Sequence, residues 1–156
     1  MIKTKYIIII FIFLLTNCGF EVIDYSKQNN FKIERIETKG DNAINYRLKN
    51  KIKVISNAQS LNLIELSFSS KKNSSIKEKN IKNEITKYKL EIISEVNYKF
   101  LNRDKQGSFV ISVQSDYAVA QKYSQTQKNQ ADVLETLTDE LSAEIRRKLS
   151  QNLNDL

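Results

Sequence analysis

The segment KYKLEIISEVNYKF, residues 87–100, alternates apolar and polar side chains along most of its length. Its even positions carry Tyr88, Leu90, Ile92, Val96, Tyr98 and Phe100, and its odd positions carry Lys87, Lys89, Glu91, Glu95, Asn97 and Lys99. Successive side chains of a β-strand point to opposite faces of the sheet. The segment therefore predicts a strand with one buried face and one charged, solvent-exposed face.

The next segment of the chain repeats this pattern. Its apolar side carries Phe109, Ile111, Val113, Tyr117, Val119 and, at the far end, Tyr123. The polar stretch NRDKQGS, residues 102–108, predicts a turn that joins the two strands into a long antiparallel hairpin. Fifteen residues at about 3.3 Å each span about 50 Å, so we expect the hairpin to twist strongly or to project beyond the helices that cover it.

Upstream, the pattern predicts a strand, a helix and a second strand. Phe31–Thr38 is a strand whose alternation slips near Arg35, which indicates a bulge or a strand end there. Gly40-Asp41 ends this strand, and Asp41 or Asn42 can cap the helix that follows. One apolar stripe on that helix is formed by Ile44, Leu48, Ile52 and Ile55. Leu61–Ser70 then returns to a period of two.

Two further segments complete the chain. Lys71–Ile85 contains five lysines and few apolar residues, which predicts a mobile connection, with a short helical turn over residues 76–85 as the alternative. The C-terminal segment predicts a helix with one apolar stripe. That stripe consists of Leu134, Leu137, Leu141, Ile145 and Leu149.

The resulting order β-α-β-β-β-α predicts a single α+β domain over residues 31–156. Each helix has one apolar stripe and each strand one apolar face, so two layers are enough to bury them. We expect a two-layer sandwich with a four-stranded, mainly antiparallel sheet, two helices on one of its faces and a long β-hairpin. The opposite face of the sheet is expected to stay polar.

The N-terminal residues have the layout of an export signal. Lys3 and Lys5 precede the apolar run Tyr6–Leu15, which at about 15 Å is too short to cross a membrane as a helix. Cys18, the only cysteine, follows this run, and the residues before it resemble a bacterial lipoprotein lipobox, although Asn17 stands where such boxes carry Gly, Ala or Ser. A retained membrane anchor with an inert thiol is the alternative.

This resemblance implies a signal peptide over residues 1–17, lipidation of Cys18 with acyl chains such as palmitate, and a tether over residues 18–30. Several acyl chains hold a protein on a membrane permanently, whereas a single chain binds only marginally. Gly19 is not the aspartate of an inner-membrane retention signal. We therefore expect the periplasmic side of the outer membrane of a Gram-negative cell.

The composition argues against an enzyme. Without histidine, the chain lacks histidine acid/base catalysis and histidine metal ligation. Without a second cysteine, it has no intramolecular disulfide and no thiolate zinc site. Its three glycines lie far apart and form no phosphate-binding loop. We expect no cofactor, no metal and no nucleic-acid partner, and no acidic pair is marked out as catalytic.

The charge balance is basic. Removal of residues 1–17 leaves 23 basic and 18 acidic side chains, a net charge of +5. A basic surface suits anionic partners such as lipid head groups or phosphorylated sugars. The alternative is that this charge reflects only a chain rich in Ile, Lys and Asn, as AT-rich coding produces.

Taken together, these features resemble the lipopolysaccharide-assembly lipoprotein family, the LptE-like proteins. The resemblance rests on Cys18-Gly19-Phe20, the order of elements, the long pair of strands around Arg103–Ser108, and the C-terminal helix with Leu141, Ile145 and Leu149. It implies a lipoprotein that plugs a large outer-membrane β-barrel, the LptD-like lipopolysaccharide translocon. It also implies that the lipoprotein supports assembly of the barrel and contacts lipopolysaccharide during transport.

Basic side chains on exposed loops and on the polar sheet face are the candidates for contact with phosphorylated sugars. The candidate ligand-binding residues are Lys71, Lys72, Arg103 and Lys105, with Lys89 and Lys99 behind them on the polar face. Solvated side chains without a ligand are the alternative for each of them. The alternative function is a generic periplasmic lipoprotein, either an adaptor or a glycan-binding module of another envelope complex.

Overall fold

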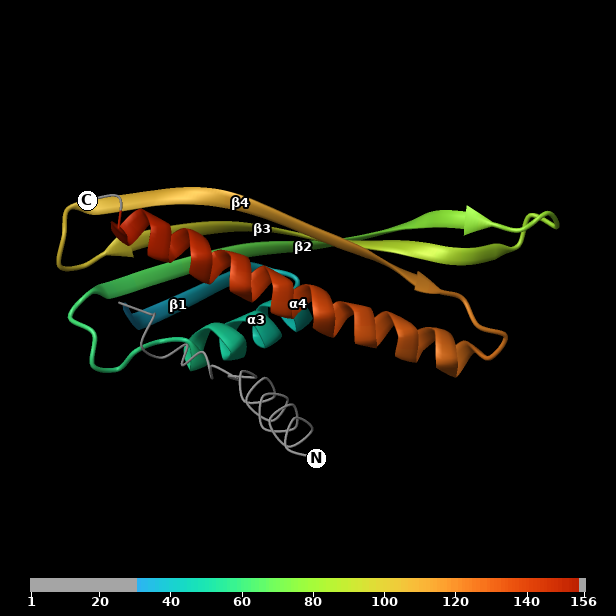
Figure 1. The fold of residues 1–156 in the computed structure, drawn as a ribbon, viewed down its shortest axis with the longest axis horizontal. Coiled ribbons are helices and arrows are strands. Elements are labelled where there is room, and N and C mark those ends of the chain that lie inside the picture. Colours follow the sequence, from blue (N-terminus) through green and yellow to red (C-terminus); the bar gives the residue numbers. More distant parts are fainter. Residues whose placement is uncertain (1–30, 155–156) are drawn as a thin grey trace, which may run out of the picture.

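The computed structural model describes residues 31–154, which form one four-stranded sheet with two helices packed on one of its faces (Figure 1). The elements are β1 (Lys32–Gly40), α3 (Asn42–Val54), β2 (Leu63–Lys79), β3 (Ile85–Phe100), β4 (Lys105–Ala118) and α4 (Tyr123–Asn154). The strands lie in the order β1-β2-β3-β4; β1 is parallel to β2, and the other pairs are antiparallel. The predicted α+β class and element order are confirmed.

The β1–α3 unit follows the sequence closely. A register shift between Ile33 and Arg35 confirms the predicted bulge. Gly40 has φ of 88°, a conformation that favours glycine, and a Cβ there would lie 2.2 Å from the backbone oxygen of Ser70. Asp41 caps α3, because its Oδ1 accepts hydrogen bonds from the backbone N–H groups of Ala43 and Ile44.

The expected mobile connection over Lys71–Ile85 is wrong. Residues up to Lys79 continue β2, and only Asn80–Glu84 form a turn. The Asn80 side-chain oxygen accepts hydrogen bonds from the N–H groups of Lys82 and Glu84, while Asn83 adopts φ of 65°. Lysines do not prevent this strand from forming, because backbone pairing with β3 continues to Lys79 and long side chains extend into solvent.

The second hairpin and the last helix differ from the expected boundaries. β4 begins at Lys105 and ends at Ala118, so the turn at Leu101–Asp104 is shorter than predicted. Tyr123 does not extend the strand but begins α4, a helix of 32 residues. At 1.5 Å per residue, α4 is about 48 Å long and runs along most of the sheet. No helix within residues 31–154 is long and apolar enough to cross a membrane.

The core lies between the sheet and the two helices. The even-numbered residues of β2 and β3 face the helices, and the expected stripe residues Ile44, Leu48 and Ile52 of α3 are fully buried against them. From α4 the core takes Leu137, Leu141, Ile145, Leu149 and Leu153. Two serines of the helix-facing surface, Ser70 and Ser94, are buried and share a hydrogen bond of 3.1 Å between their hydroxyl oxygens.

An ion-pair cluster joins the two helices. Lys51 of α3 donates to Glu135 and Asp139 of α4 at 2.6 and 2.5 Å, and Arg47 also contacts Glu135. The hydrogen bond from Lys51 holds the pKa of Glu135 below its usual value. Hydrogen bonds to Asp139 and then Glu135 raise the pKa of Lys51. The cluster therefore favours the charged forms on both helices.

The sheet divides into two halves along its strands. In the proximal half, up to the level of Ser70, Ser94 and Ile111, both helices cover four strands. In the distal half, β1 and α3 are absent, because β1 ends at Gly40 opposite Ser70 and α3 starts there. Figure 1 shows β2 and β3 continuing beyond them, with β4 crossing both strands in projection as the sheet twists. The twist expected of the β3–β4 hairpin is present, but the hairpin that projects beyond α3 is formed by β2 and β3, which the sequence did not predict.

Candidate functional site

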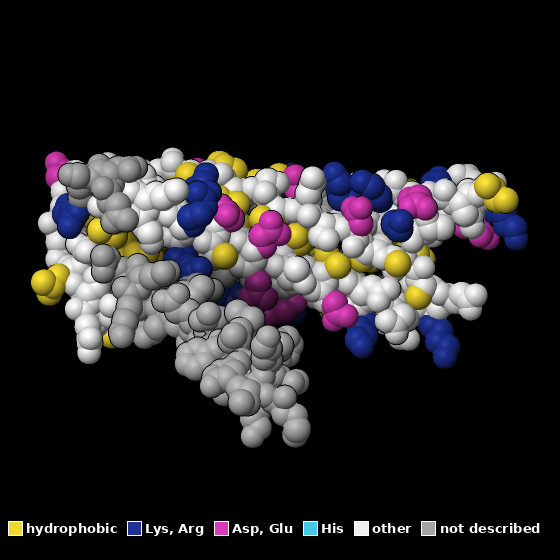
Figure 2. Space-filling model, viewed as in Figure 1, with side chains coloured by type: hydrophobic (Ala, Val, Ile, Leu, Met, Phe, Trp, Pro, Cys, Tyr) yellow, Lys and Arg dark blue, Asp and Glu magenta, His cyan; other side chains and the backbone are white. Residues whose placement is uncertain are grey.

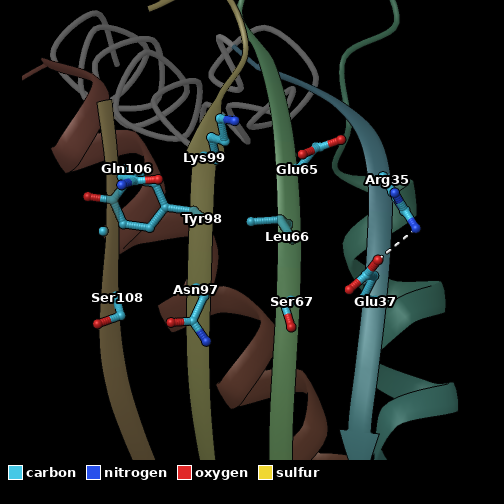
Figure 3. A pocket seen from close by; sticks show the side chains of 11 residues that line it. Arg35, Glu37, Glu65, Leu66, Ser67, Asn97, Tyr98, Lys99, Gln106 and Ser108 are labelled. Atoms are coloured by element: carbon cyan, nitrogen blue, oxygen red, sulfur yellow. Dashed lines mark ion pairs between the residues drawn. The ribbon is translucent and has the colours of Figure 1, made fainter. Parts of the chain in front are cut away.

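The open face of the sheet, opposite the helices, carries polar side chains in rows across the strands. One row consists of Arg35, Glu65, Lys99 and Gln106, and the next of Glu37, Ser67, Asn97 and Ser108. Together they line a shallow cavity of about 440 Å³ (Figure 3). The predicted polar character of the odd-numbered face of β3 is confirmed, with Glu95, Asn97 and Lys99 exposed.

Charges of both signs alternate across this cavity. Arg35 and Glu37 form an ion pair of 2.8 Å along β1, drawn as the dashed line in Figure 3. Glu65 and Lys99 are directly opposite each other on β2 and β3. Within the described chain, no group of three or more acidic side chains could hold a metal ion. The proximal open face is therefore suited to polar contacts with a partner surface rather than to one charged ligand.

A glycine lets an aromatic ring lie at the edge of this cavity. Gly107 of β4 is paired with Tyr98 of β3, and a Cβ on Gly107 would lie 2.7 Å from the Tyr98 hydroxyl. The Tyr98 ring lies across β4 towards Gln106 in Figure 3. It packs edge-on against Phe100, with ring centroids 5.6 Å apart, and is 8% exposed. The glycine thus fixes where the aromatic core ends and the polar face begins.

The distal hairpin, residues 71–89, concentrates positive charge. It contains seven lysines and two glutamates, a net charge of +5 within 19 residues. Figure 2 shows Lys and Arg side chains gathered over the distal ends of β2 and β3, with a few carboxylates among them. The described residues outside this hairpin carry a net charge of only +2. The basic excess of the chain is therefore mainly local rather than spread over the surface.

Ion pairs engage part of this charge. Lys87 pairs with Glu78 at 2.7 Å across the two strands, and Lys77 lies 3.7 Å from Asp116 on β4. The hydrogen bond between Lys87 and Glu78 lowers the pKa of the glutamate and raises that of the lysine. Within the hairpin, Lys71 and Lys82 are exposed and have no side-chain partner among residues 31–154. These two lysines of the hairpin are therefore accessible to an external anion.

The six predicted ligand-binding residues do not form one cluster. Lys71, Lys72 and Lys89 lie in the distal hairpin, while Lys99, Arg103 and Lys105 lie at the opposite end of the sheet. Lys89 and Lys99 share the open face, as expected, but ten residues of strand separate them by about 33 Å. A single phosphorylated sugar cannot contact both groups.

Three of the six have structural contacts, and one of them, Lys89, donates to the side-chain oxygen of Gln114 on β4 at 2.9 Å. Lys72 points to the helix side of the sheet, where its ammonium lies 3.7 Å from Asp41. Lys105 is the first residue of β4, and its ammonium donates to the backbone oxygen of Asn152 near the end of α4. Lysine at a helix C-terminus offsets unpaired carbonyls and the helix dipole. Lys72 and Lys105 are thus in strands rather than on the exposed loops that the sequence suggested.

Sequence reasoning missed four further lysines of the distal hairpin, namely Lys77, Lys79, Lys82 and Lys87, as candidate ligand contacts. A signal for them was present. No glycine or proline interrupts residues 63–79, and two asparagines frame Ile81-Lys82, which is typical of a turn between strands. Cys18 and the residues 1–30 around it lie outside the described residues, so lipidation stays a prediction.

Comparison with known proteins supports the fold through structure and not through sequence. No protein-family model matches the chain, and no curated protein matches its sequence. Rare lipoprotein B from Shewanella oneidensis has a similar structure, with a TM-score of 0.59 and 8% identity over 78% of this chain and 97% of that one.

Two further lipoproteins are similar. One, from Caulobacter crescentus, has a TM-score of 0.57 and 12% identity over 81% of this chain and 93% of its own. The other, lipoprotein B from Nitrosomonas europaea, has a TM-score of 0.55 and 12% identity over 85% of this chain and 90% of its own. At such low identity these likenesses establish the fold alone. The chain has the two-layer fold seen in these bacterial lipoproteins.

Proposed function

We propose that this protein is a lipid-anchored envelope lipoprotein of the LptE-like type, which supports a large outer-membrane β-barrel translocon and contacts lipopolysaccharide during transport. The observation that carries the proposal is the shared fold with rare lipoprotein B, which is LptE. The role is one of binding and assembly and involves no catalysis. Its anchor would be Cys18, on the periplasmic side of the outer membrane.

The open face supports the barrel partnership. The lumen of a large outer-membrane barrel is polar, so a protein inside it needs a polar exterior and an apolar core that is already buried. The rows of Arg35, Glu65 and Lys99 provide such an exterior, and the helices bury the apolar face of the sheet. Charges of both signs on the open face suit a partner surface with complementary charges.

The distal hairpin supports the contact with lipopolysaccharide. Phosphorylated sugars attract clustered lysines, and this attraction weakens as salt screens exposed charges. The hairpin has a net charge of +5, and Lys71 and Lys82 are exposed and unpaired among the described residues. The hairpin also projects beyond α3, which leaves its lysines accessible. We therefore place the anionic contact in the distal hairpin rather than at Arg103 and Lys105.

Co-purification tests the partnership. The full-length protein, expressed in its own cells, is solubilised in detergent from envelope membranes and captured through a C-terminal tag. We expect a large β-barrel protein to be recovered in a stoichiometric amount, and we expect Cys18→Ser to reduce this recovery because the variant loses its membrane tether. Recovery of an envelope complex without any large barrel would overturn the proposal and favour the adaptor role.

A titration with purified lipopolysaccharide tests the anionic contact. We expect Lys71→Glu/Lys82→Glu to weaken binding at low salt by about tenfold, because two exposed attractions become repulsions. The matched control is Lys39→Glu/Lys53→Glu, which makes the same change of net charge at exposed proximal positions. Equal affinities of the two double variants would contradict a specific role of the hairpin.

A further inference from the structure

A groove on the helix side of the distal half has a composition unlike that of its surroundings. It has a volume of about 560 Å³ and lies where α4 begins, between that helix and the sheet. We call it the tyrosine groove and define it by Ser74, Tyr88, Tyr117, Tyr123, Gln127 and Gln130. None of the residues that line it is charged, although the distal hairpin beside it carries a net charge of +5.

The fold creates the groove because α3 does not extend into the distal half. With α3 absent, only α4 packs over this end of the sheet, and the helix-facing side of β2 beyond Lys72 stays uncovered. The corner between β4 and α4 is fixed by side chains. Thr126 accepts a hydrogen bond from the N–H of Ala120, and Asn129 donates to the backbone oxygen of Ala118, both at 2.9 Å. The wall of the groove is therefore preformed.

Aromatic rings line the groove from three elements. Tyr88 of β3 and Tyr117 of β4 are paired across the strands and stack, with ring centroids 5.6 Å apart and an interplanar angle of 25°. Tyr117 is nearly buried, at 7% exposure, whereas Tyr123 at the start of α4 is 77% exposed. The groove thus has a fixed aromatic floor and one ring that is free to meet a ligand.

The polar groups of the groove are not used by the fold. Thr126 and Asn129 hold the corner, but Gln127, Gln130 and the tyrosine hydroxyls have no hydrogen-bond partner within residues 31–154. A glutamine amide offers both donors and an acceptor, and a tyrosine hydroxyl offers one of each. Neutral donors and acceptors beside aromatic rings are thus available together in one preformed groove.

We propose that the tyrosine groove binds a neutral saccharide. The C–H groups of a sugar ring pack on aromatic faces, which carry the negative part of the ring quadrupole. The hydroxyl groups of the sugar form hydrogen bonds with amide and phenol groups. A phosphorylated ligand would find no cation among the lining residues, and an acyl chain would leave the amides unsatisfied. The saccharide can belong to lipopolysaccharide or to another envelope glycan. The proposal does not depend on a barrel partner.

The test is a binding measurement on the whole folded domain by nuclear magnetic resonance. The probes are dephosphorylated, deacylated core oligosaccharide from lipopolysaccharide and, as a second source, a neutral glucan oligosaccharide. We expect saturable shifts of amide signals at Tyr88, Tyr117 and Gln130 with at least one probe. Tyr123→Ala/Gln130→Ala is expected to weaken that binding at least tenfold, because both side chains line the groove and neither has a hydrogen-bond partner within residues 31–154.

Two comparisons make the outcome decisive. Lys39→Glu/Lys53→Glu serves as the control and is expected to leave neutral-saccharide binding unchanged, because both lysines lie in the proximal half and neither lines the groove. Absence of binding by both probes, or binding that survives Tyr123→Ala/Gln130→Ala, would overturn the proposal. Failure of the barrel co-purification with intact saccharide binding would instead refute only the proposed translocon role.

Discussion

The proximal and distal halves of the sheet share strands and yet differ in almost every other property. In the proximal half two helices cover the sheet, and Ile64, Leu66 and Phe68 of β2 are at most 2% exposed. In the distal half one helix remains, and Ile76 of the same strand and face is 51% exposed. β2 thus remains a strand in the distal half, where its helix-facing side chains are exposed, because its backbone pairing with β3 continues across the boundary.

The boundary has a local physical cause. Gly40 ends β1 opposite Ser70, and Asp41 directly caps α3, so the strand ends and the helix begins at the same level of the sheet. At this level, where the apolar core narrows, the buried hydroxyl groups of Ser70 and Ser94 form a hydrogen bond with each other. Beyond it, the edge of β2 has no neighbour within the described residues, and lysines occupy that edge. Charged edges discourage pairing with other chains.

The largest expected difference between the halves concerns two isoleucines of β2. Ile64→Ala removes a fully buried side chain, so we expect the free energy of unfolding to fall by about 2–5 kcal/mol. Ile76→Ala, its control on the same face, is expected to cost about 0.5 kcal/mol, because half of that side chain is already in water. Urea unfolding measures both. Similar losses would show that the distal half is as tightly packed as the proximal half.

A second prediction concerns the boundary itself. Gly40→Ala places a Cβ 2.2 Å from the Ser70 backbone oxygen at φ of 88°, so we expect a loss of about 2 kcal/mol or more. Gly107→Ala is the control, because Gly107 does not have a positive φ and the nearest atoms to its Cβ would belong to the Tyr98 side chain and not to the backbone. Thermal unfolding of both variants measures the difference. An equal loss of stability in the two variants would contradict a special role of the Gly40 backbone conformation at the boundary.

The smallest expected effect concerns ion pairs of the two halves. The folded pKa of Glu135 is lowered from 4.5, so its contribution to stability is present above that pH and is lost as pH falls through the folded pKa. We expect Glu135→Gln to cost below about 1 kcal/mol at neutral pH and to become neutral in acid.

Glu78→Gln in the distal hairpin is the control for this measurement. The pKa of Glu78 is also lowered, by Lys87, but both side chains are about half exposed and the pair joins two strands that are already paired. We expect a smaller effect on stability with the same dependence on pH. Urea unfolding at neutral and acidic pH checks both. A larger effect for Glu78 would contradict the view that the helix contact contributes more.

Much of the fold could be predicted from the sequence, because patterns of apolar and polar residues within short segments indicate most of its strands and helices. The alternation over 87–100 identified β3, and the apolar stripes identified α3 and the buried side of α4. The bulge near Arg35 was visible as a slip in phase. The continuation of β2 through Lys71–Lys79 was missed, because its polar side chains show little alternation and its stability comes from β3.

The candidate site was less predictable. The sequence identified basic residues as candidates, but it could not show that Lys71 and Lys89 lie far from Lys99 and Arg103, because that distance depends on the pairing of the strands. It gave no sign that Lys105 holds the end of α4. The tyrosine groove was equally hidden, because its rings come from β3, β4 and α4.

By itself, the sequence determined the element order, the apolar faces and the concentration of lysines between residues 71 and 89, because each depends on neighbours within a few positions. Only the tertiary structure decided that those lysines form a projecting hairpin, that α3 covers half of the sheet, and that three tyrosines share one groove. These features depend on strand register and helix length acting together across distant parts of the chain, and no local pattern encodes that combination.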